Sequence, residues 1–500
     1  MSTTYARVNR CRVMIKWYTA SSYSDEAAYL DSFSGQMRLN PPFTTVLANR
    51  GIVDQIGIIL NNKGHRYSSL LPSSDLYSET SEGIWYQSRV YVEVSVDDGA
   101  TYYRIFTGVI KDMSESTMTE KEVGQVIFDC RSSEELLLNQ KLTTTYADFV
   151  NSHNGNETES DILARWLGAA GVSSSDYSLD DGLFCIPWAA LKDESPVENG
   201  WDLASACGGR FYMDHQSGKF IYENATSILG KSVVTSIDRS MYAALRVKYP
   251  DVNLFKKVTV KIYDSTVGPA DTVFSLDKPI QVAPGATEVH EYDLDNPVTN
   301  YIALSYKAST TGGKDISSDV TITGAYYAQK LSLSIANANS AAAYVRLLKH
   351  TGQALGTTSD ASAKKISANS FWDHVTSRER TIDNKYVQAR AQAASLADML
   401  ITSGETMLQA LEIGDYLGNP LLTLGNIVSV LDDKIMSSSK DYVVTALNFR
   451  FSDIGFRQTL ELVELDRLVP YYGGISPNDY ATFDSTKYGD VGAGIGRLFF

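Results

Sequence analysis

Two alternating segments joined by a short polar turn are the clearest structural signal in this sequence: Arg89-Val-Tyr-Val-Glu-Val-Ser-Val96, Asp97-Asp98-Gly99 and Tyr102-Tyr-Arg-Ile-Phe-Thr-Gly-Val-Ile110. Apolar and polar side chains alternate in both long segments, which is the period of a β-strand with one buried face. Asp and Gly tolerate the backbone angles of a tight turn, so the triplet between the segments favours a hairpin. Residues 89–110 are therefore predicted to form a β-hairpin.

The residues around this hairpin carry further strand patterns and no helical period. The additional predicted strands are Cys11–Tyr18, Asp54–Leu60 and Val123–Asp129. Consecutive strands without helices between them favour a small barrel or sandwich. Residues 1–135 are therefore predicted to form a first barrel-like β domain.

The hydrophobic period becomes helical between residues 136 and 235. Thr158-x-x-Asp161 is a capping-box pattern, and the apolar residues from 162 to 170 then share one helical face. A second helix is predicted from Glu198 to Ala206, followed by a hairpin over 210–223. The segment 136–235 is therefore predicted to be an α+β domain.

Strand patterns return later in the chain in two separate blocks. Strands at 244–249 and 257–263 are expected to continue beyond residue 380, where a helix is predicted from Asp383 to about Ser403. Four more predicted strands lie at 405–413, 426–431, 441–451 and 456–465. Residues 236–270 and 381–470 are therefore predicted to form a second barrel-like β domain. A similarity between residues 94–98 and 428–433 is consistent with two related β domains.

The remaining residues divide into an insertion and a tail. Residues 271–380 have short strand patterns separated by Ser-, Thr-, Ala- and Gly-rich turns, which predicts an inserted β-sandwich. Residues 471–500 show no period and are predicted to be a C-terminal arm. The predicted fold class is thus α+β, mostly β, with two barrel-like β domains, one α/β domain and the inserted sandwich.

Composition restricts the class of function. The 500 residues include 44 Lys and Arg against 59 Asp and Glu, giving a net charge of −15. This balance disfavours a protein that grips nucleic acid phosphates, because such binding needs clustered cations. The first residues lack the apolar stretch of a secretory signal, and no run approaches the roughly 18 apolar residues of a membrane-spanning helix. We expect a globular protein that is made soluble in a reducing compartment.

Histidine and cysteine residues form no pattern that is typical of catalysis or metal binding. The six His residues are never spaced as metal ligands on one helix face, and the four Cys residues are far apart. Cys207 and His215 flank a predicted hairpin and could form a thiol and its base, but packing at a helix end explains Cys207 better. Gly492-x-Gly494-x-Gly496 lacks the strand and helix that a dinucleotide site needs.

The acidic pairs in the sequence also favour structural roles. Asp97-Asp98, Asp180-Asp181 and Asp432-Asp433 all lie at predicted turns. Asp293-Leu-Asp295-Asn296 could contact calcium but lacks the Gly and distal Glu of a recognised loop. Asn224-Ala-Thr226 matches a glycan acceptor but is interpreted as a strand end. We predict no catalytic, cofactor-binding or metal-binding residues, and no enzyme activity.

Four segments together resemble the tail hub proteins of long-tailed bacteriophages, also called baseplate hub or tail tip proteins, and their relatives in contractile injection systems. The segments are Asp54–Tyr67 with its Asn-rich turn, Val90–Asp112 with Phe106-Thr107-Gly108, the two helices and hairpin between 162 and 222, and the region from Asp383 to Val430. Asn426 stands where Asp is usual in the family. The resemblance covers most of the chain outside 271–380 and the last thirty residues.

The resemblance implies a structural role in the virion. Two similar barrels in each of three subunits would form a ring that adapts a sixfold tail tube to a threefold tip. The expected partners are further copies of the chain, the distal tail or tube protein, tip, spike or fibre proteins and the tape measure protein. DNA would pass through the ring without specific binding, and residues 271–380 would face outward, towards fibres or host surface glycan.

Two alternatives remain open from the sequence. One is a tail-associated hydrolase of cell-wall polymer with carboxylates hidden in 271–380. The other is a receptor-binding or carbohydrate-binding tail protein, for which the aromatic pair in Phe371-Trp372-Asp373 is the candidate in the insertion.

Overall fold

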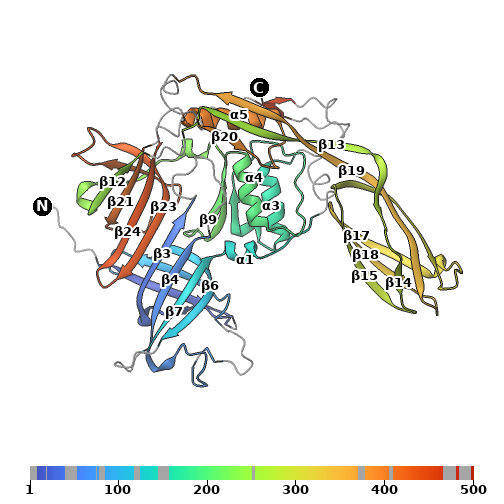
Figure 1. Cartoon of the computed structure of the whole chain (residues 1–500). Helices are drawn as coiled ribbons and strands as arrows, with labels where there is room; N and C mark the ends of the chain where they lie inside the picture. Colours follow the sequence, from blue (N-terminus) through green and yellow to red (C-terminus); the bar gives the residue numbers. More distant parts are fainter. Residues whose placement is uncertain are drawn as a thin grey trace.

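The computed structural model describes residues 8–18, 20–39, 53–74, 76–77, 85–116, 124–144, 157–249, 254–369, 378–404, 409–465, 480–482 and 497–499. Figure 1 shows two curled β domains beside a central domain that contains helices, and a sandwich held away from them by two long strands. The α+β, mostly β, fold class is confirmed. Among the described residues, no helix is long and apolar enough to cross a membrane.

The first β domain contains the predicted hairpin. Strand β5 (Arg89–Ser95) pairs with β6 (Tyr103–Ser116), and Arg89 lies opposite Val109. The alternation places Val90, Val92 and Val94 in the core. The other strands are β1 (Arg10–Lys16), β2 (Ser24–Asp25), β3 (Leu30–Arg38), β4 (Gln55–Asn62) and β7 (Gly124–Ser132).

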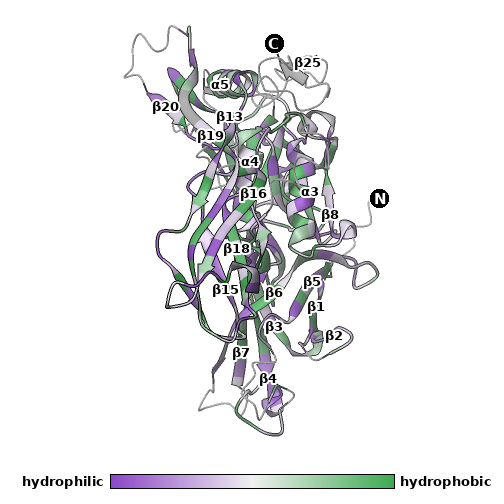
Figure 2. Cartoon of the chain, turned by 90° about the vertical axis from the view of Figure 1, so that its right-hand side faces the viewer, coloured by the Kyte–Doolittle hydropathy of each residue, from purple (hydrophilic) through white to green (hydrophobic). Residues whose placement is uncertain are grey.

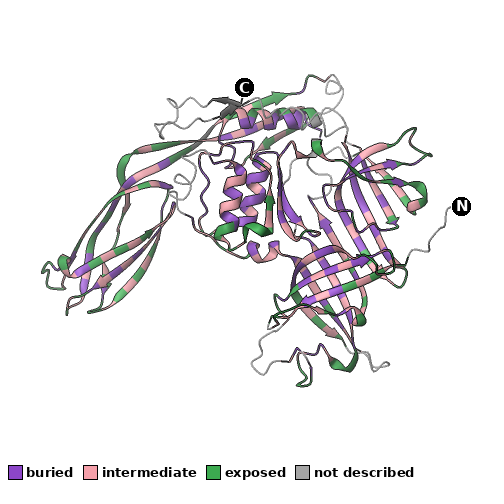
Figure 3. Cartoon of the chain, turned by 180° about the vertical axis from the view of Figure 1, so that it is seen from behind, coloured by how far each residue is buried: buried purple, intermediate pink, exposed green. Residues whose placement is uncertain are grey.

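The central domain packs helices against a small sheet. Its helices are α1 (Glu134–Leu138), α3 (Glu159–Ala169) and α4 (Pro196–Ala206), and its strands are β8 (Tyr177–Leu179), β9 (Arg210–Asp214) and β10 (Lys219–Glu223). The predicted capping box at Thr158 and Asp161 is present at the start of α3. Figure 3 shows the inner faces of α3 and α4 buried, and Trp166 and Leu203 lie in this core.

The second β domain is assembled from residues on both sides of the insertion. Its strands are β11 (Val233–Asp238), β12 (Ala244–Lys248), β21 (Ala410–Tyr416), β22 (Ile427–Leu431), β23 (Lys440–Ser452) and β24 (Gly455–Glu464). Strand β11 runs parallel to β22, whereas β12 pairs with β21 in antiparallel orientation.

The strand predicted at 257–263 does not join the second β domain. It is the start of β13 (Lys257–Ser275), which pairs with β19 (Ala343–Ile366) and with β20 (Glu379–Ile382). The predicted boundary at residue 270 therefore falls inside one strand. The alternating residues Val258, Val260 and Ile262 do require a buried sheet face, but alternation does not reveal a partner about a hundred residues away.

The long helix begins later than predicted. Helix α5 spans Arg390–Gly404, whereas the sequence pattern predicts a start at Asp383. Residues 383–389 instead form turns, in which Asn384 Oδ1 accepts the Tyr386 N–H at 3.0 Å. Gln392 Oε1 accepts the Gln388 N–H at 3.0 Å. These side-chain bonds hold the backbone in a form that competes with a helix.

The insertion is a sandwich of two antiparallel sheets, as its alternating strands indicate (Figure 2). One sheet contains β14 (Ile280–Val282), β16 (Val298–Ser309) and part of β19; the other contains β15 (Thr287–Asp293), β17 (Val320–Tyr326) and β18 (Lys330–Asn337). Twelve buried apolar residues, Leu331, Leu333 and Ile335 among them, form its core. Within the predicted arm 471–500, the structure describes β25 (Tyr480–Thr482) and β26 (Arg497–Phe499), which pair with each other.

Candidate functional site: the junction of the β domains

Strand β3 of the first β domain pairs with β23 of the second, so that one 13-stranded sheet runs through both domains. The antiparallel register extends from Arg38 opposite Ala446 to Phe33 opposite Phe451. The rings of Phe33 and Phe451 stack with centroids 5.5 Å apart. A single apolar core continues under the pairing from one domain to the other. We call the β3–β23 pairing the seam.

Gly35 allows the seam to close. It lies opposite Phe449, and a Cβ atom at Gly35 would be 2.6 Å from Phe449 Cζ and 2.8 Å from the Gln55 carbonyl oxygen. Distances this short cannot be accommodated without moving a buried ring or a backbone. The aromatic side chain on β23 thus requires a residue without a side chain on β3.

The β9–β10 hairpin of the central domain holds His215 against the first β domain. His215 Nδ1 accepts the Thr107 N–H at 3.0 Å, so the ring proton resides on Nε2, which lies 2.9 Å from Asp54 Oδ2. Thr107 Oγ1 donates to the His215 carbonyl at 3.0 Å. The imidazole also stacks on Phe106, with ring centroids 4.9 Å apart.

These contacts give the Phe106-Thr107-Gly108 segment its structural role. Phe106 and Thr107 bind His215, and a Cβ at Gly108 would lie 1.9 Å from the Arg131 carbonyl oxygen on β7. Asp54 also supports the seam, because its Oδ1 accepts the Arg38 N–H at 2.8 Å. The segment therefore joins three elements of the chain at one buried point.

His215 and Cys207 each have other partners in the structure. Cys207 Sγ lies 3.6 Å from Gln392 Nε2, and burial raises the pKa of the thiol well above its usual range. His215 is instead occupied by Asp54 and Thr107. A buried thiol that resists ionisation is a poor nucleophile.

Glu134 adds a second buried carboxyl next to Asp54. Burial, and then the charge of Asp54, raise the pKa of Glu134 to about 8. Burial also raises the pKa of Asp54. The Ser132 hydroxyl donates to Glu134 Oε2 at 2.8 Å. A glutamic acid at this position favours the protonated form when the chain is folded.

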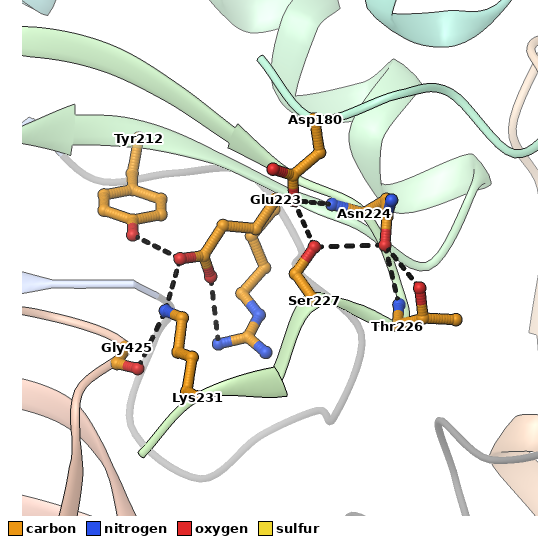
Figure 4. Close-up of polar contacts among 9 residues, drawn as sticks. Asp180, Tyr212, Glu223, Asn224, Thr226, Ser227, Lys231 and Gly425 are labelled. Carbon is orange, nitrogen blue, oxygen red and sulfur yellow. Dashed lines mark hydrogen bonds and ion pairs between the residues drawn. The ribbon is translucent and has the colours of Figure 1, made fainter. Parts of the chain in front are cut away.

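A polar cluster around Glu223 binds the same hairpin to the second β domain (Figure 4). Glu223 Oε1 accepts the Tyr212 hydroxyl at 2.9 Å and is also contacted by Lys231 Nζ. Lys231 Nζ donates to the Gly425 carbonyl at 3.0 Å, in the loop before β22. Burial and the neighbouring Glu223 raise the pKa of Tyr212, which keeps its hydroxyl a donor. Sequence patterns give no sign of this cluster, because Gly425 lies more than 190 residues after Lys231.

The loop of the second β domain next to this cluster is shaped by its own side chains. Asn426 Oδ1 accepts the Thr423 N–H at 2.9 Å, a bond that the Asp usual in tail hub proteins could also make. Gln216 Nε2 donates to the Pro420 carbonyl at 2.9 Å. The hairpin therefore contacts both β domains through side-chain to backbone bonds.

The other residues singled out in the sequence have structural partners. Asn224 Oδ1 accepts from Thr226 and Ser227, as expected of a strand end. Asp97 accepts the Thr101 N–H in its turn, and Asp432 accepts the Tyr242 hydroxyl. Asp293 lies 3.3 Å from Lys192 Nζ. Within the described ranges, no group of three or more His, Cys, Asp or Glu side chains could hold a metal ion. Gly492–Gly496 and Phe371–Asp373 lie outside the described residues.

The fold is similar to that of a solved tail protein. The tail protein from Neisseria meningitidis MC58 is similar over 93% of this chain and 99% of its own, with a TM-score of 0.50 and 10% identity. The 43 kDa tail protein of prophage MuSo2 from Shewanella oneidensis is similar over 92% and 99%, with a TM-score of 0.49 and 12% identity. The type VI secretion component c3393 of E. coli is described as structurally similar to the T4 tail proteins gp27 and gp5. It is similar over 87% of this chain and 73% of its own, with a TM-score of 0.36 and 9% identity.

The two sequence comparisons give no match. No family model matches the chain, and no curated protein matches it. The resemblance to tail proteins that the sequence segments indicate is therefore confirmed at the level of the fold.

We expect Gly35→Ala to destabilise the protein by about 1–3 kcal/mol, because the added methyl group overpacks the seam. Gly57→Ala on the adjacent strand β4 is the matched control, since its Cβ would have only the Ser34 carbonyl oxygen at 3.9 Å. Urea unfolding of both variants measures the difference. Equal stabilities would show that the seam is not tightly packed at Gly35.

We expect Glu134→Gln to stabilise the protein at pH 9 by about 1–3 kcal/mol and to have little effect at pH 5. The folded chain keeps Glu134 protonated up to about pH 8, whereas the unfolded chain releases the proton near pH 4.5. The wild-type carboxyl therefore lowers stability as pH rises between these values, and the amide does not. Urea unfolding at both pH values tests this; a constant difference between the two proteins would contradict it.

Proposed function

We propose that the chain is a non-enzymatic structural protein of a phage tail, which forms a trimeric ring at the distal end of the tail tube. Each subunit contributes two β domains, so a ring of three subunits would present six β domains to a sixfold tube. The same ring would present three copies of its other domains to a threefold tip. The observation that carries the proposal is the seam, which fixes both β domains of one chain in a single sheet. A symmetry adaptor needs this constant geometry.

The buried polar groups at the junction support a structural role. Asp54, Glu223 and His215 all bind neighbouring elements of the fold. Side chains used in this way are unavailable to a substrate. They hold the central domain against both β domains, which would keep every subunit of a ring in one shape.

The partners follow from the place of the ring in the tail. One face would meet the distal tail or tube protein, and the other the tip, spike or fibre proteins, with the tape measure protein reaching the lumen. DNA would pass through the ring to the host. The net charge of −15 is compatible with this passage, because a surface without clustered cations does not retain phosphates. The protein would be assembled in the host cytoplasm.

A second candidate function, host-surface binding by residues 271–380, is favoured by one observation. Lys307, Arg346 and Lys349 lie on the outer face of the sandwich sheet and are exposed. Lys307 of β16 lies opposite Leu347 of β19. The register shifts between Lys307 and Ala308, so Arg346 of β19 has no residue opposite it on β16 and lies next to Leu347. Asp315 is the acidic neighbour of Lys307. Three cations on one face fit an anionic surface glycan.

Particle symmetry tests the ring. We expect purified full-length protein at high concentration to have about three times the mass of the 55.0 kDa chain and to give threefold class averages with a central hole in negative stain. Gly35→Ala should reduce the fraction of rings, whereas Gly57→Ala should not. Particles of another symmetry, or rings equally abundant in both variants, would count against the proposal.

Glycan binding is tested separately. Replacing Lys307, Arg346 and Lys349 by Gln should reduce binding to host cells with anionic surface polymer at least about tenfold, because cation–anion pairs are lost. The control replaces the exposed residues Lys63, Arg89 and Lys434 of the β domains by Gln, with the same change in net charge. Equal binding by the two triple variants would eliminate this candidate.

A further inference from the structure

The sandwich is joined to the rest of the chain by a ribbon of two strands, made of residues 263–267 of β13 and 355–361 of β19. At Ala354 strand β16 pairs with β19 as a third strand, and the sandwich sheet begins. The base of these strands, with Val258 and Val260, packs in the core of the central domain below α5. Beyond Ile262 the ribbon leaves that core. Thr266, Val267, Pro269 and Ala270 are exposed, as are Gly356 and Thr357 (Figure 3).

The ribbon is interrupted where it is most exposed. The β13–β19 register shifts between Ile262 and Asp264, between Val267 and Ala270, and between Thr272 and Phe274. The middle shift contains Gly268 and Pro269, and proline has no N–H to give to the ladder. Two strands without a core of their own are marginally stable. The ribbon by itself therefore does not fix the direction of the sandwich.

A small apolar cluster fixes that direction. Trp188 and Ala190 of the central domain pack with Ala328 of the sandwich and with Leu355 at the sandwich end of the ribbon, and all four are buried. Gln388 holds the Trp188 backbone from both sides: its Oε1 accepts the Trp188 N–H at 2.9 Å, and its Nε2 donates to the Trp188 carbonyl at 2.6 Å. Across the interface, the Ala328 N–H donates to the Thr144 carbonyl at 3.1 Å.

Two ion pairs lie at the edge of the cluster. Lys192 Nζ is 3.3 Å from Asp293 Oδ1, and Lys330 Nζ is 3.2 Å from Asp193 Oδ2. Lys330 Nζ is also 2.9 Å from Glu291 Oε2 within the insertion. The carboxylates are more than half exposed, so salt screens these pairs.

We propose that the sandwich is a hinged arm, which turns about the Gly268–Pro269 segment and is held in the docked position by a latch consisting of the Trp188 cluster and these two ion pairs. The latch has four buried apolar residues, whereas the sandwich has twelve in its own core. The latch can therefore open while both parts remain folded. An arm of this kind would let the sandwich change direction relative to the β domains, and the inference does not depend on the ring.

Ala328→Arg tests the latch in the full-length protein, because the fully buried Ala328 has no room for the longer side chain. We expect hydrogen exchange to accelerate about tenfold or more in the segments around residues 188 and 328, with β18 still protected. The maximum dimension in small-angle X-ray scattering should increase. Ala325→Arg, at an exposed position of β17, is the matched control and should change neither quantity. Unchanged exchange at residue 188 in Ala328→Arg would overturn the proposal.

A second variant, which changes only charged residues, tests the latch if Ala328→Arg also unfolds β18. Replacing Asp293 by Asn and Lys330 by Gln removes both ion pairs without touching the apolar cluster. We expect several-fold faster exchange around residues 188 and 328 in this variant, and a similar acceleration of the wild-type protein in 1 M salt. If neither change accelerates exchange there, the sandwich is rigidly fixed and the hinge does not exist.

Discussion

The pairing of β3 with β23 is the contact on which the rest of the structure depends. An open sheet edge leaves backbone N–H and C=O groups unpaired, and each β domain here uses the other to cover such an edge. The core then continues across the seam, with Phe33 of one domain on Phe451 of the other. Gly35 is the residue that permits this approach. The two β domains consequently behave as one body, although they lie at opposite ends of the sequence.

The central domain reinforces this body from one side. Its β9–β10 hairpin contacts the first β domain through His215 and the second through Gln216. Each contact pairs a buried or half-buried polar side chain with a backbone group, which gives it a defined geometry as well as stability. Packing the central domain against the first β domain also buries the Glu134 carboxyl group. Burial disfavours its charged form, and its pKa is raised. By contrast, the sandwich meets the central domain through one small cluster, the Ala328–Thr144 backbone hydrogen bond and exposed ion pairs.

Local features of this chain could be predicted from its sequence, and distant pairings could not. The 89–110 hairpin and the Thr158 capping box depend on neighbouring residues, so alternation and spacing are sufficient to find them. The pairing of Lys257 with Ile366 and of Phe33 with Phe451 depends on which buried edges fit, and period-two patterns are the same for every possible partner. The Phe106-Thr107-Gly108 segment is visible in the sequence, but its role depends on the position of His215, 108 residues from Thr107. The late start of α5 depends on Asn384 and Gln392, whose side chains compete with the helix.

Amide hydrogen exchange along β3 and β23 in the full-length protein tests most directly whether the seam unites the two β domains. If it does, the amides of residues 33–38 exchange as slowly as those in the middle of β24, and they are released only when the whole body unfolds. Fast exchange of β3, while β4 and β24 remain protected, would show that the domains separate readily. The two β domains would then be independent units, which contradicts a seam that holds them as one body.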